Sequence, residues 1–154
     1  MPRVARTRVI AAPREKVWAL VSDPHHLPRW WPKASRVEDV HGEPGARRAR
    51  WTVVLQTAKG SGVRADYRCV SAAEGERYVW EQDLEDTPFE RIVRSSETGV
   101  QLEGRDGDTA VTVYTRERLR GLSRLGSSMM RGAARRRLDE ALDGLERALV
   151  GDGP

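Results

Sequence analysis

The spacing of apolar residues in the first part of the chain predicts a strand followed by two short helices. Residues 3–11 fit a strand. After Pro13, the segment REKVWALVSD places Val17, Leu20 and Val21 on one face of a helix. The next segment, HHLPRWW, fits a short second helix or turn that a proline ends.

Beyond these helices, the pattern predicts several strands and then one long helix. Residues 36–119 contain short alternating runs separated by the turn segments HGEPG, KGSG, AEGE, EDTP and RDGD, which is typical of antiparallel hairpins. After Gly121 the period changes to three and four residues, which predicts a helix to about Val150 that Gly151 ends. The apolar positions of this helix are Leu122, Leu125, Met129, Ala133, Leu138, Leu142, Leu145 and Leu149.

These elements together predict an α+β fold. We expect a curved antiparallel sheet of about seven strands wrapped around the long C-terminal helix, with the two short helices between strands 1 and 2. A sheet without βαβ units has helices on one face only, so the long helix is expected to lie across that face. We expect a single domain over residues 1–150 and a short disordered tail over 151–154.

Alternation within the strands predicts which side chains face the interior. The inward set is rich in rings with a few polar groups among them, which is typical of a ligand pocket rather than of a plain aliphatic core. The alternative is that the same rings fill a thin core beneath the helix. The expected inward set is Ala49, Trp51, Val53, Leu55, Val63, Ala65, Tyr67, Cys69, Ser71, Tyr78, Trp80 and Gln82.

A tight turn at residues 74–75 provides a test of this assignment. Two central turn residues at that place would pair Cys69 with Trp80 and Ser71 with Tyr78. Directly opposed residues share a face of the sheet. The expected pairs agree with the inward set, which the polarity of the side chains alone had indicated.

The Asp-Gly turn at residues 106–107 predicts the last hairpin in the same way. It pairs Leu102 with Val111 and Val100 with Val113, all facing inward. Further along the last strand, the same face continues with Thr115, Glu117 and Leu119. On the preceding strand, Ile92 and Arg94 join this face if residues 89–96 run on without a bulge, whereas a bulge near 97–99 would reverse them.

Composition limits the class of protein and its location. The chain has 154 residues, of which 38% are hydrophobic and 32% charged, as in a soluble globular domain. No apolar run approaches the roughly 20 residues of a membrane span, and the N-terminus lacks a signal-peptide pattern. We therefore expect no transmembrane segment and a cytoplasmic protein. Cys69 is the sole cysteine, so an internal disulfide is excluded.

The opening segment VIAAPREKVWALVSDPHHLPRWWP resembles the START/polyketide cyclase–dehydrase superfamily, also called SRPBCC or helix-grip. The segment GDTAVTVYTRERLRG resembles the final strand of that superfamily, and the terminal helix resembles its closing helix. The matching positions are Ala12-Pro13, Val17-Trp18, Asp23-Pro24 and Trp31-Pro32. The resemblance implies a deep cavity between the sheet and the long helix. It also implies that the cavity holds a lipid, a polyketide or an aromatic compound, and some members catalyse cyclisation or aromatisation there.

The inward set and the resemblance together yield a list of expected site residues. Trp30 and Trp31 lie in one segment, where one is expected to plug the core and the other to close the pocket. We expect the ligand to contact Trp31, Trp51, Val53, Leu55, Tyr67, Cys69, Tyr78, Trp80, Gln82, Val113, Thr115, Met129 and Met130.

Glu117 is the candidate catalytic residue. A carboxylate that faces the interior without a partner has a raised pKa, which suits general acid–base catalysis. The alternative is an ion-paired or solvent-facing Glu117, with Arg94 on the neighbouring strand as the partner. His25 and His26 are expected at a helix cap or on the surface, and no set of metal ligands accompanies them. We expect no metal and no cofactor.

Three functions remain open from the sequence. The first is binding of a hydrophobic small molecule, the second is an enzyme of the cyclase or aromatase type, and the third is interaction with a partner through an arginine-rich belt. The net charge of +4 raises the question of nucleic acid, but no aromatic residues interleave with the belt, so nucleic acid is not expected. A monomer and a homodimer both stay open. The belt comprises Arg116, Arg118, Arg120, Arg124, Arg131, Arg135, Arg136 and Arg137.

Overall fold

In the residues that it describes, the computed structural model has seven strands, three α-helices and one 3-10 helix. It describes residues 3–57, 60, 62–85, 93–119 and 124–151. In chain order the elements are β1 (Val4–Ile10), α1 (Arg14–Val21), the 3-10 helix η1 (Pro24–His26), α2 (Leu27–Trp30), β2 (Ala34–His41), β3 (Arg50–Gln56), β4 (Gly62–Ala73), β5 (Arg77–Asp83), β6 (Val93–Arg105), β7 (Asp108–Leu119) and α3 (Arg124–Val150).

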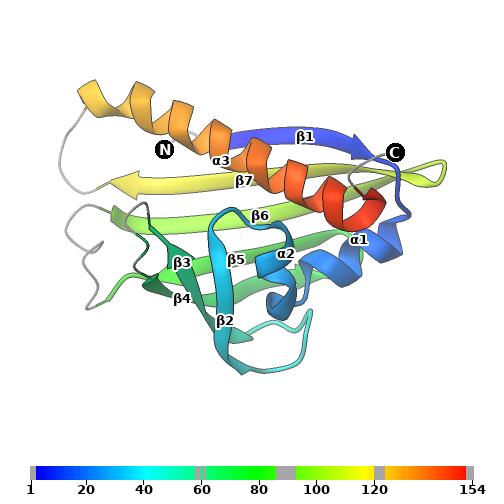
Figure 1. The fold of residues 1–154 in the computed structure, drawn as a ribbon, viewed down its shortest axis with the longest axis horizontal. Coiled ribbons are helices and arrows are strands. Elements are labelled where there is room, and N and C mark those ends of the chain that lie inside the picture. Colours follow the sequence, from blue (N-terminus) through cyan, green and yellow to red (C-terminus); the bar gives the residue numbers. More distant parts are fainter. Residues whose placement is uncertain (1–2, 58–59, 61, 86–92, 120–123, 152–154) are drawn as a thin grey trace.

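The strands form one sheet in the order β1-β7-β6-β5-β4-β3-β2, and every neighbouring pair is antiparallel. Figure 1 shows the sheet curving around α3, with α1 and α2 near the C-terminal end of that helix. This arrangement confirms the expected α+β fold, with its long closing helix and two short helices between β1 and β2.

The short helices form where the sequence predicts them. α1 follows Pro13 and buries Val17, Leu20 and Val21. Asp23 then caps η1, because its carboxylate accepts a hydrogen bond from the backbone N–H of His25. The His25 ring also contacts Asp23, with 2.9 Å between Nδ1 and Oδ1, and it lies at the surface.

The β6–β7 hairpin has the predicted register. Leu102 pairs with Val111 and Val100 with Val113. The central turn residues 106–107 both adopt positive φ angles, 49° and 94°, as a two-residue hairpin turn requires.

The β6–β7 hairpin contains a register shift, but not at the position considered from the sequence. The bulge considered near residues 97–99 is absent from the described hairpin. The register shifts between Val93 and Ser95 instead. Thr98 and Ser96 therefore stay on the interior face, opposite Thr115 and Glu117. Ile92 and the side chain of Arg94 fall outside the described residues.

The β4–β5 hairpin confirms one predicted pair and corrects the other. Cys69 lies opposite Trp80, as expected. The pairing of Ser71 with Tyr78 is wrong, because Ala72 occupies the place opposite Tyr78.

The correction follows from the length of the turn. Three residues, not two, lie between the paired residues Ala73 and Arg77, and Gly75 in their middle has a φ of 74°. The extra residue is absorbed by a register shift between Cys69 and Ser71. Such a shift re-aims every side chain beyond it, which is why the prediction held on one side of the shift only.

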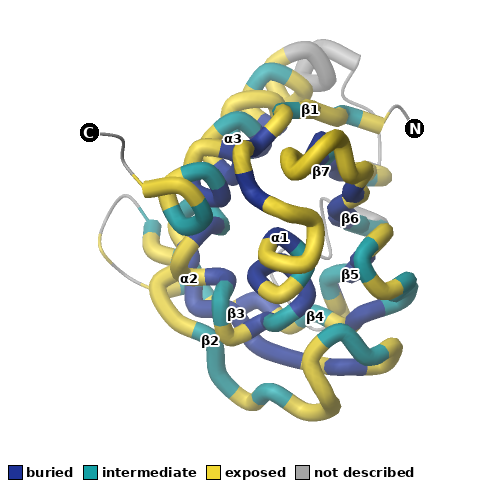
Figure 2. The backbone as a smooth tube through the Cα atoms, turned by 90° about the vertical axis from the view of Figure 1, so that its right-hand side faces the viewer, coloured by how far each residue is buried: buried dark blue, intermediate teal, exposed yellow. Residues whose placement is uncertain are grey.

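The C-terminal half of α3 is anchored on both the core and the edge strand β1. Its buried side is formed by Leu138, Ala141, Leu142 and Leu145. Figure 2 shows buried and exposed positions alternating along α1 and α3, as amphipathic helices require. On the outside, charged side chains of β1 reach α3: Arg6 Nε lies 2.9 Å from Asp139 Oδ1, and Arg8 Nη1 lies 2.7 Å from Asp143 Oδ1.

Gly144 permits the close packing of α2 against α3. A Cβ atom at this position would lie 2.3 Å from the carbonyl oxygen of Trp30, so any larger residue would push the helices apart. Within the described part of the chain, no helix has the length and apolar composition needed to cross a membrane.

Candidate ligand-binding site

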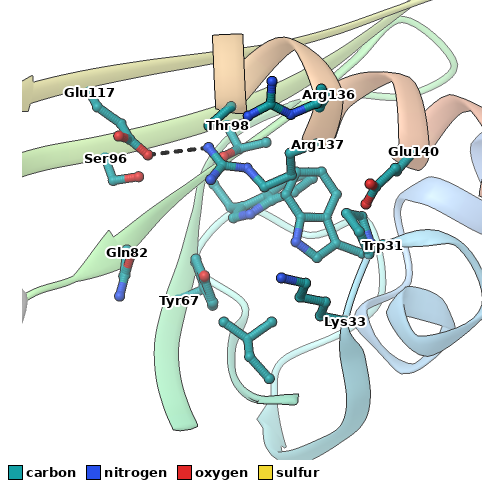
Figure 3. Close-up of a pocket in the computed structure, with 14 residues that line it drawn as sticks. Trp31, Lys33, Tyr67, Gln82, Ser96, Thr98, Glu117, Arg136, Arg137 and Glu140 are labelled. Atoms are coloured by element: carbon teal, nitrogen blue, oxygen red, sulfur yellow. Dashed lines mark hydrogen bonds and ion pairs between the residues drawn. The ribbon is translucent and has the colours of Figure 1, made fainter. Parts of the chain in front are cut away.

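A pocket of about 540 Å³ lies beneath the middle of α3. Its walls come from the inner face of the sheet, from one side of α3 and from the turn after α2 (Figure 3). The lining residues are Trp31, Pro32, Lys33, Leu55, Tyr67, Trp80, Gln82, Ser96, Thr98, Glu117, Ala133, Arg136, Arg137 and Glu140.

Aromatic rings form one wall of the pocket. The rings of Trp31 and Trp80 meet edge to face, with 5.9 Å between centroids and 77° between planes. Tyr67 stacks on Trp51 behind it, at 6.3 Å and 20°. These contacts limit the rotamers of the rings, so the wall is a preorganised apolar surface.

Polar side chains form the opposite part of the pocket. Glu117 of β7 and Arg137 of α3 make an ion pair with 3.4 Å between Oε1 and Nη2, and their side chains are 28% and 41% exposed. Arg137 is therefore the partner that the structure describes for Glu117, whereas the side chain of Arg94 lies outside the described residues. Ser96 on β6 lies directly opposite Glu117 in the sheet, and Figure 3 shows both side chains on the same side of the pocket.

The pKa of the Tyr67 hydroxyl is raised to about 12. Burial is the largest cause; the positive charge of Arg137 acts against it, and the negative charge of Glu117 adds to it. Tyr67 therefore stays protonated at neutral pH and can donate a hydrogen bond into the pocket.

A family model described as "Polyketide cyclase / dehydrase and lipid transport" matches residues 1–150. The chain belongs to this family. A comparison with curated proteins finds no match.

Solved structures share the fold of this polyketide cyclase/dehydrase and lipid transport family member. A protein of Thermus thermophilus has a TM-score of 0.74 at 20% identity, covering 99% of this chain and 100% of that one. A START superfamily protein from Mycobacterium smegmatis has a TM-score of 0.77 at 16% identity, covering 96% of each chain. The Zhui aromatase/cyclase from Streptomyces sp. R1128 has a TM-score of 0.71 at 19% identity, covering 99% of each chain. At these identities the likeness shows the fold alone.

The structure divides the site residues expected from the sequence into three groups. Trp31, Leu55, Tyr67, Trp80, Gln82 and Glu117 line the pocket of this family member. Met129 and Met130 are 77% and 38% exposed and do not contribute to the pocket wall. The others are buried outside its lining: Trp51, Val53, Cys69, Tyr78, Val113 and Thr115.

Two residues of the buried group, Trp51 and Tyr78, belong to an aromatic cluster behind the pocket. Tyr78 lies within about 6 Å of the rings of Trp18, Trp51 and Trp80, with centroid distances of 6.0, 6.3 and 5.9 Å. The two interpretations made from the sequence thus each apply to part of the rings: the deeper ones fill a core, and the outer ones line a pocket.

Several polar atoms of the cluster are buried without a normal hydrogen bond. Among the described residues, Nε1 of Trp30, Nε1 of Trp51 and the Tyr78 hydroxyl have no such partner. Burial raises the pKa of the Tyr78 hydroxyl, and the adjacent Cys69 thiol adds to the effect. Burial likewise raises the pKa of Cys69, so this thiol is a poor nucleophile.

Sequence reasoning missed more than half of the residues that line the pocket. Ala133, Arg137 and Glu140 repeat at helical spacing, and this could have identified one stripe of α3 as the pocket side. Thr98 and Ser96 follow from the alternation that begins at Val100. Lys33 carried no comparable signal, because its position depends on the turn geometry after α2.

Proposed function

We propose that this protein binds a hydrophobic small molecule in the pocket beneath α3. The observation that carries the proposal is the position and lining of the pocket: it lies between the sheet and the long helix, and the rings of Trp31, Tyr67 and Trp80 form its apolar wall. A volume of about 540 Å³ lies within the range of roughly 300–1,000 Å³ typical of small-molecule sites.

The polar lining supports a ligand with a small number of hydrogen-bonding groups. Gln82, Ser96 and Thr98 lie on neighbouring strands at one part of the wall. A few fixed polar groups orient a ligand, whereas the apolar wall supplies most of the binding free energy. Lipids, polyketides and aromatic compounds all fit this description.

The family supports the same classes of ligand. Its description names lipid transport beside polyketide cyclisation and dehydration, and the similar Streptomyces protein is an aromatase/cyclase. Each class consists of molecules with a large apolar body.

Titration of intrinsic tryptophan fluorescence with a fatty acid and with a polycyclic aromatic compound tests the proposal. Ala133→Phe places a ring in the pocket without removing a core residue, and we expect it to weaken binding at least about tenfold. Val9→Phe adds the same ring to β1 at a 50% exposed position outside the pocket lining and should leave the affinity unchanged. An unresponsive wild-type protein, or equal affinities in both variants, would contradict the proposal.

A second candidate is an enzyme of the cyclase or aromatase type that uses the same pocket. It is favoured by the proximity of a carboxylate and a protonated phenol, because Glu117 acts electrostatically on Tyr67 and both line the pocket. A carboxylate can serve as a general base and a protonated phenol as a general acid. Glu117→Gln should then abolish conversion of a linear poly-β-ketone substrate while binding persists. Unchanged conversion would exclude Glu117 as the catalytic base.

A further inference from the structure

We propose that the ligand of this pocket carries one ionised acidic group and that the ammonium group of Lys33 binds it. The inference rests on the proposed function, since it assigns a chemical class to the ligand of the same pocket. The ligand class is a monoanionic amphiphile: an apolar body with one carboxylate or comparably acidic group.

The position of Lys33 is the first argument. The residue follows Trp31 and Pro32 in the turn between α2 and β2 and lines the pocket with them. Figure 3 shows its side chain extending from this turn into the pocket, with its nitrogen directed toward the side of Tyr67. The ammonium group therefore lies at the aromatic wall, where the apolar body of a ligand would rest.

The charge balance of the pocket is the second argument. The lining contains three cationic side chains, those of Lys33, Arg136 and Arg137, and two carboxylates, those of Glu117 and Glu140. Glu117 is paired with Arg137. Within the described residues, no carboxylate lies within ion-pairing distance of Lys33. A ligand anion would complete the charge balance, and the exposed side chain of Lys33 would favour a charged ligand over its neutral analogue.

The backbone at Lys33 is the third argument. Its φ of 64° is in the left-handed region, which favours glycine or asparagine over lysine. The turn is nevertheless held firmly, because the backbone N–H of Gln56 on β3 donates to the carbonyl oxygen of Lys33 at 2.8 Å. Strained residues of this kind concentrate at binding sites, where the surrounding structure fixes them. The hydrogen bond to β3 thus fixes the backbone position of Lys33 at the pocket.

Matched pairs of acidic and neutral probes test the inference. We would compare 2-naphthoic acid with 2-naphthamide, and dodecanoic acid with dodecanol, in fluorescence titrations at pH 7. The wild-type protein should bind the acid of at least one pair about tenfold or more tightly than its neutral partner. The pair with the larger difference indicates whether an aromatic or an aliphatic acid is preferred.

Three variants separate the role of Lys33 from general charge effects. Lys33→Met retains the apolar stem and should lose the preference for the acid while the neutral probe binds as before. Lys16→Met removes an exposed charge on α1, outside the pocket lining, and should keep the preference. Arg136→Met removes another exposed cation of the pocket lining and should keep most of the preference.

The outcomes distinguish failure of this inference from failure of the proposed function. If no member of either pair binds, the pocket is not a site for these ligands and the proposed function fails. If acid and neutral probe bind the wild type equally, or if the preference persists in Lys33→Met or disappears only in Arg136→Met, the assignment to Lys33 is wrong while the pocket retains its function.

Discussion

The space between the sheet and α3 is filled at one end and hollow at the other. At the filled end, the C-terminal half of α3 packs its leucines against a core that also contains Tyr78, Val100 and Val113, all 1% exposed or less. At the hollow end, the side of α3 that contains Ala133 and Arg137 borders the pocket. The same helix and the same strands thus build both a core and a cavity.

The difference arises from a gradient of polarity along neighbouring strands. On each strand, the inward side chains change from apolar to polar over a few positions, and the changes lie side by side in the sheet. The gradient runs from Tyr78 through Trp80 to Gln82 on β5, from Val100 through Thr98 to Ser96 on β6, and from Val113 through Thr115 to Glu117 on β7. Because polar side chains at the hollow end require hydrogen-bond partners, that end cannot collapse into a dry core without a desolvation cost.

The adjacent tryptophans after η1 provide the sharpest test of this comparison. Trp30 is 2% exposed and belongs to the core, so Trp30→Ala should lower the free energy of unfolding by about 3–5 kcal/mol. Trp31 is only partly buried and lines the pocket. Trp31→Ala should therefore lower the free energy of unfolding by about half as much or less, and it should also reduce ligand affinity. Urea denaturation with ligand titration measures both effects. Equal losses of stability in Trp30→Ala and Trp31→Ala would mean that the filled and hollow ends do not differ in packing.

Gly144→Ala tests the close packing of α2 against α3 at the filled end. Its new Cβ would lie 2.3 Å from the Trp30 carbonyl oxygen, and the resulting displacement of α2 should cost about 1–3 kcal/mol. Gly132→Ala is the matched control, because the nearest atom to its Cβ would be Arg136 Nη1 at 3.9 Å. Alanine is the better helix former by about 1 kcal/mol, so the control should be stabilising. A stabilised Gly144→Ala in thermal denaturation would contradict the contact with α2.

Tyr78→Phe is expected to have the smallest effect. The Tyr78 hydroxyl has no normal hydrogen-bond partner within the described residues, so its removal should change stability by less than about 0.5 kcal/mol or increase it. Tyr114→Phe serves as the control, because that hydroxyl lies 3.2 Å from Glu97 Oε2, and its loss should cost about 1 kcal/mol. A loss above about 1 kcal/mol in Tyr78→Phe would show that the hydroxyl is satisfied in solution.

Much of the fold could be predicted because local signals and tertiary structure agree. The two-residue turn at 106–107 set the register of β6 and β7, and the change of apolar period located α3. The turn after Ala73 could not be predicted with the same certainty, because Glu-Gly fits both two-residue and three-residue loops. One added residue was enough to replace Ser71 by Ala72 opposite Tyr78.

The site was less predictable than the fold for a physical reason. Strand alternation identifies an inward face, but it does not distinguish a residue that lines the pocket, such as Trp80, from one buried behind it, such as Trp51. That distinction depends on how far α3 lies from each part of the sheet. The lining contributed by α3 and by Lys33 depends on helix rotation and turn geometry, which the apolar pattern leaves undetermined.

The position of β1 at the edge of the sheet has a consequence for the order of folding. This first strand pairs only with β7, so that Ile10 lies opposite Thr109 and Val4 opposite Thr115, and Arg6 and Arg8 reach the still later α3. During synthesis, β1 has no strand to join until β7 has left the ribosome. Closure of the sheet is therefore a late folding event. Until then, the unpaired β1 segment is available to a chaperone or to a neighbouring nascent chain.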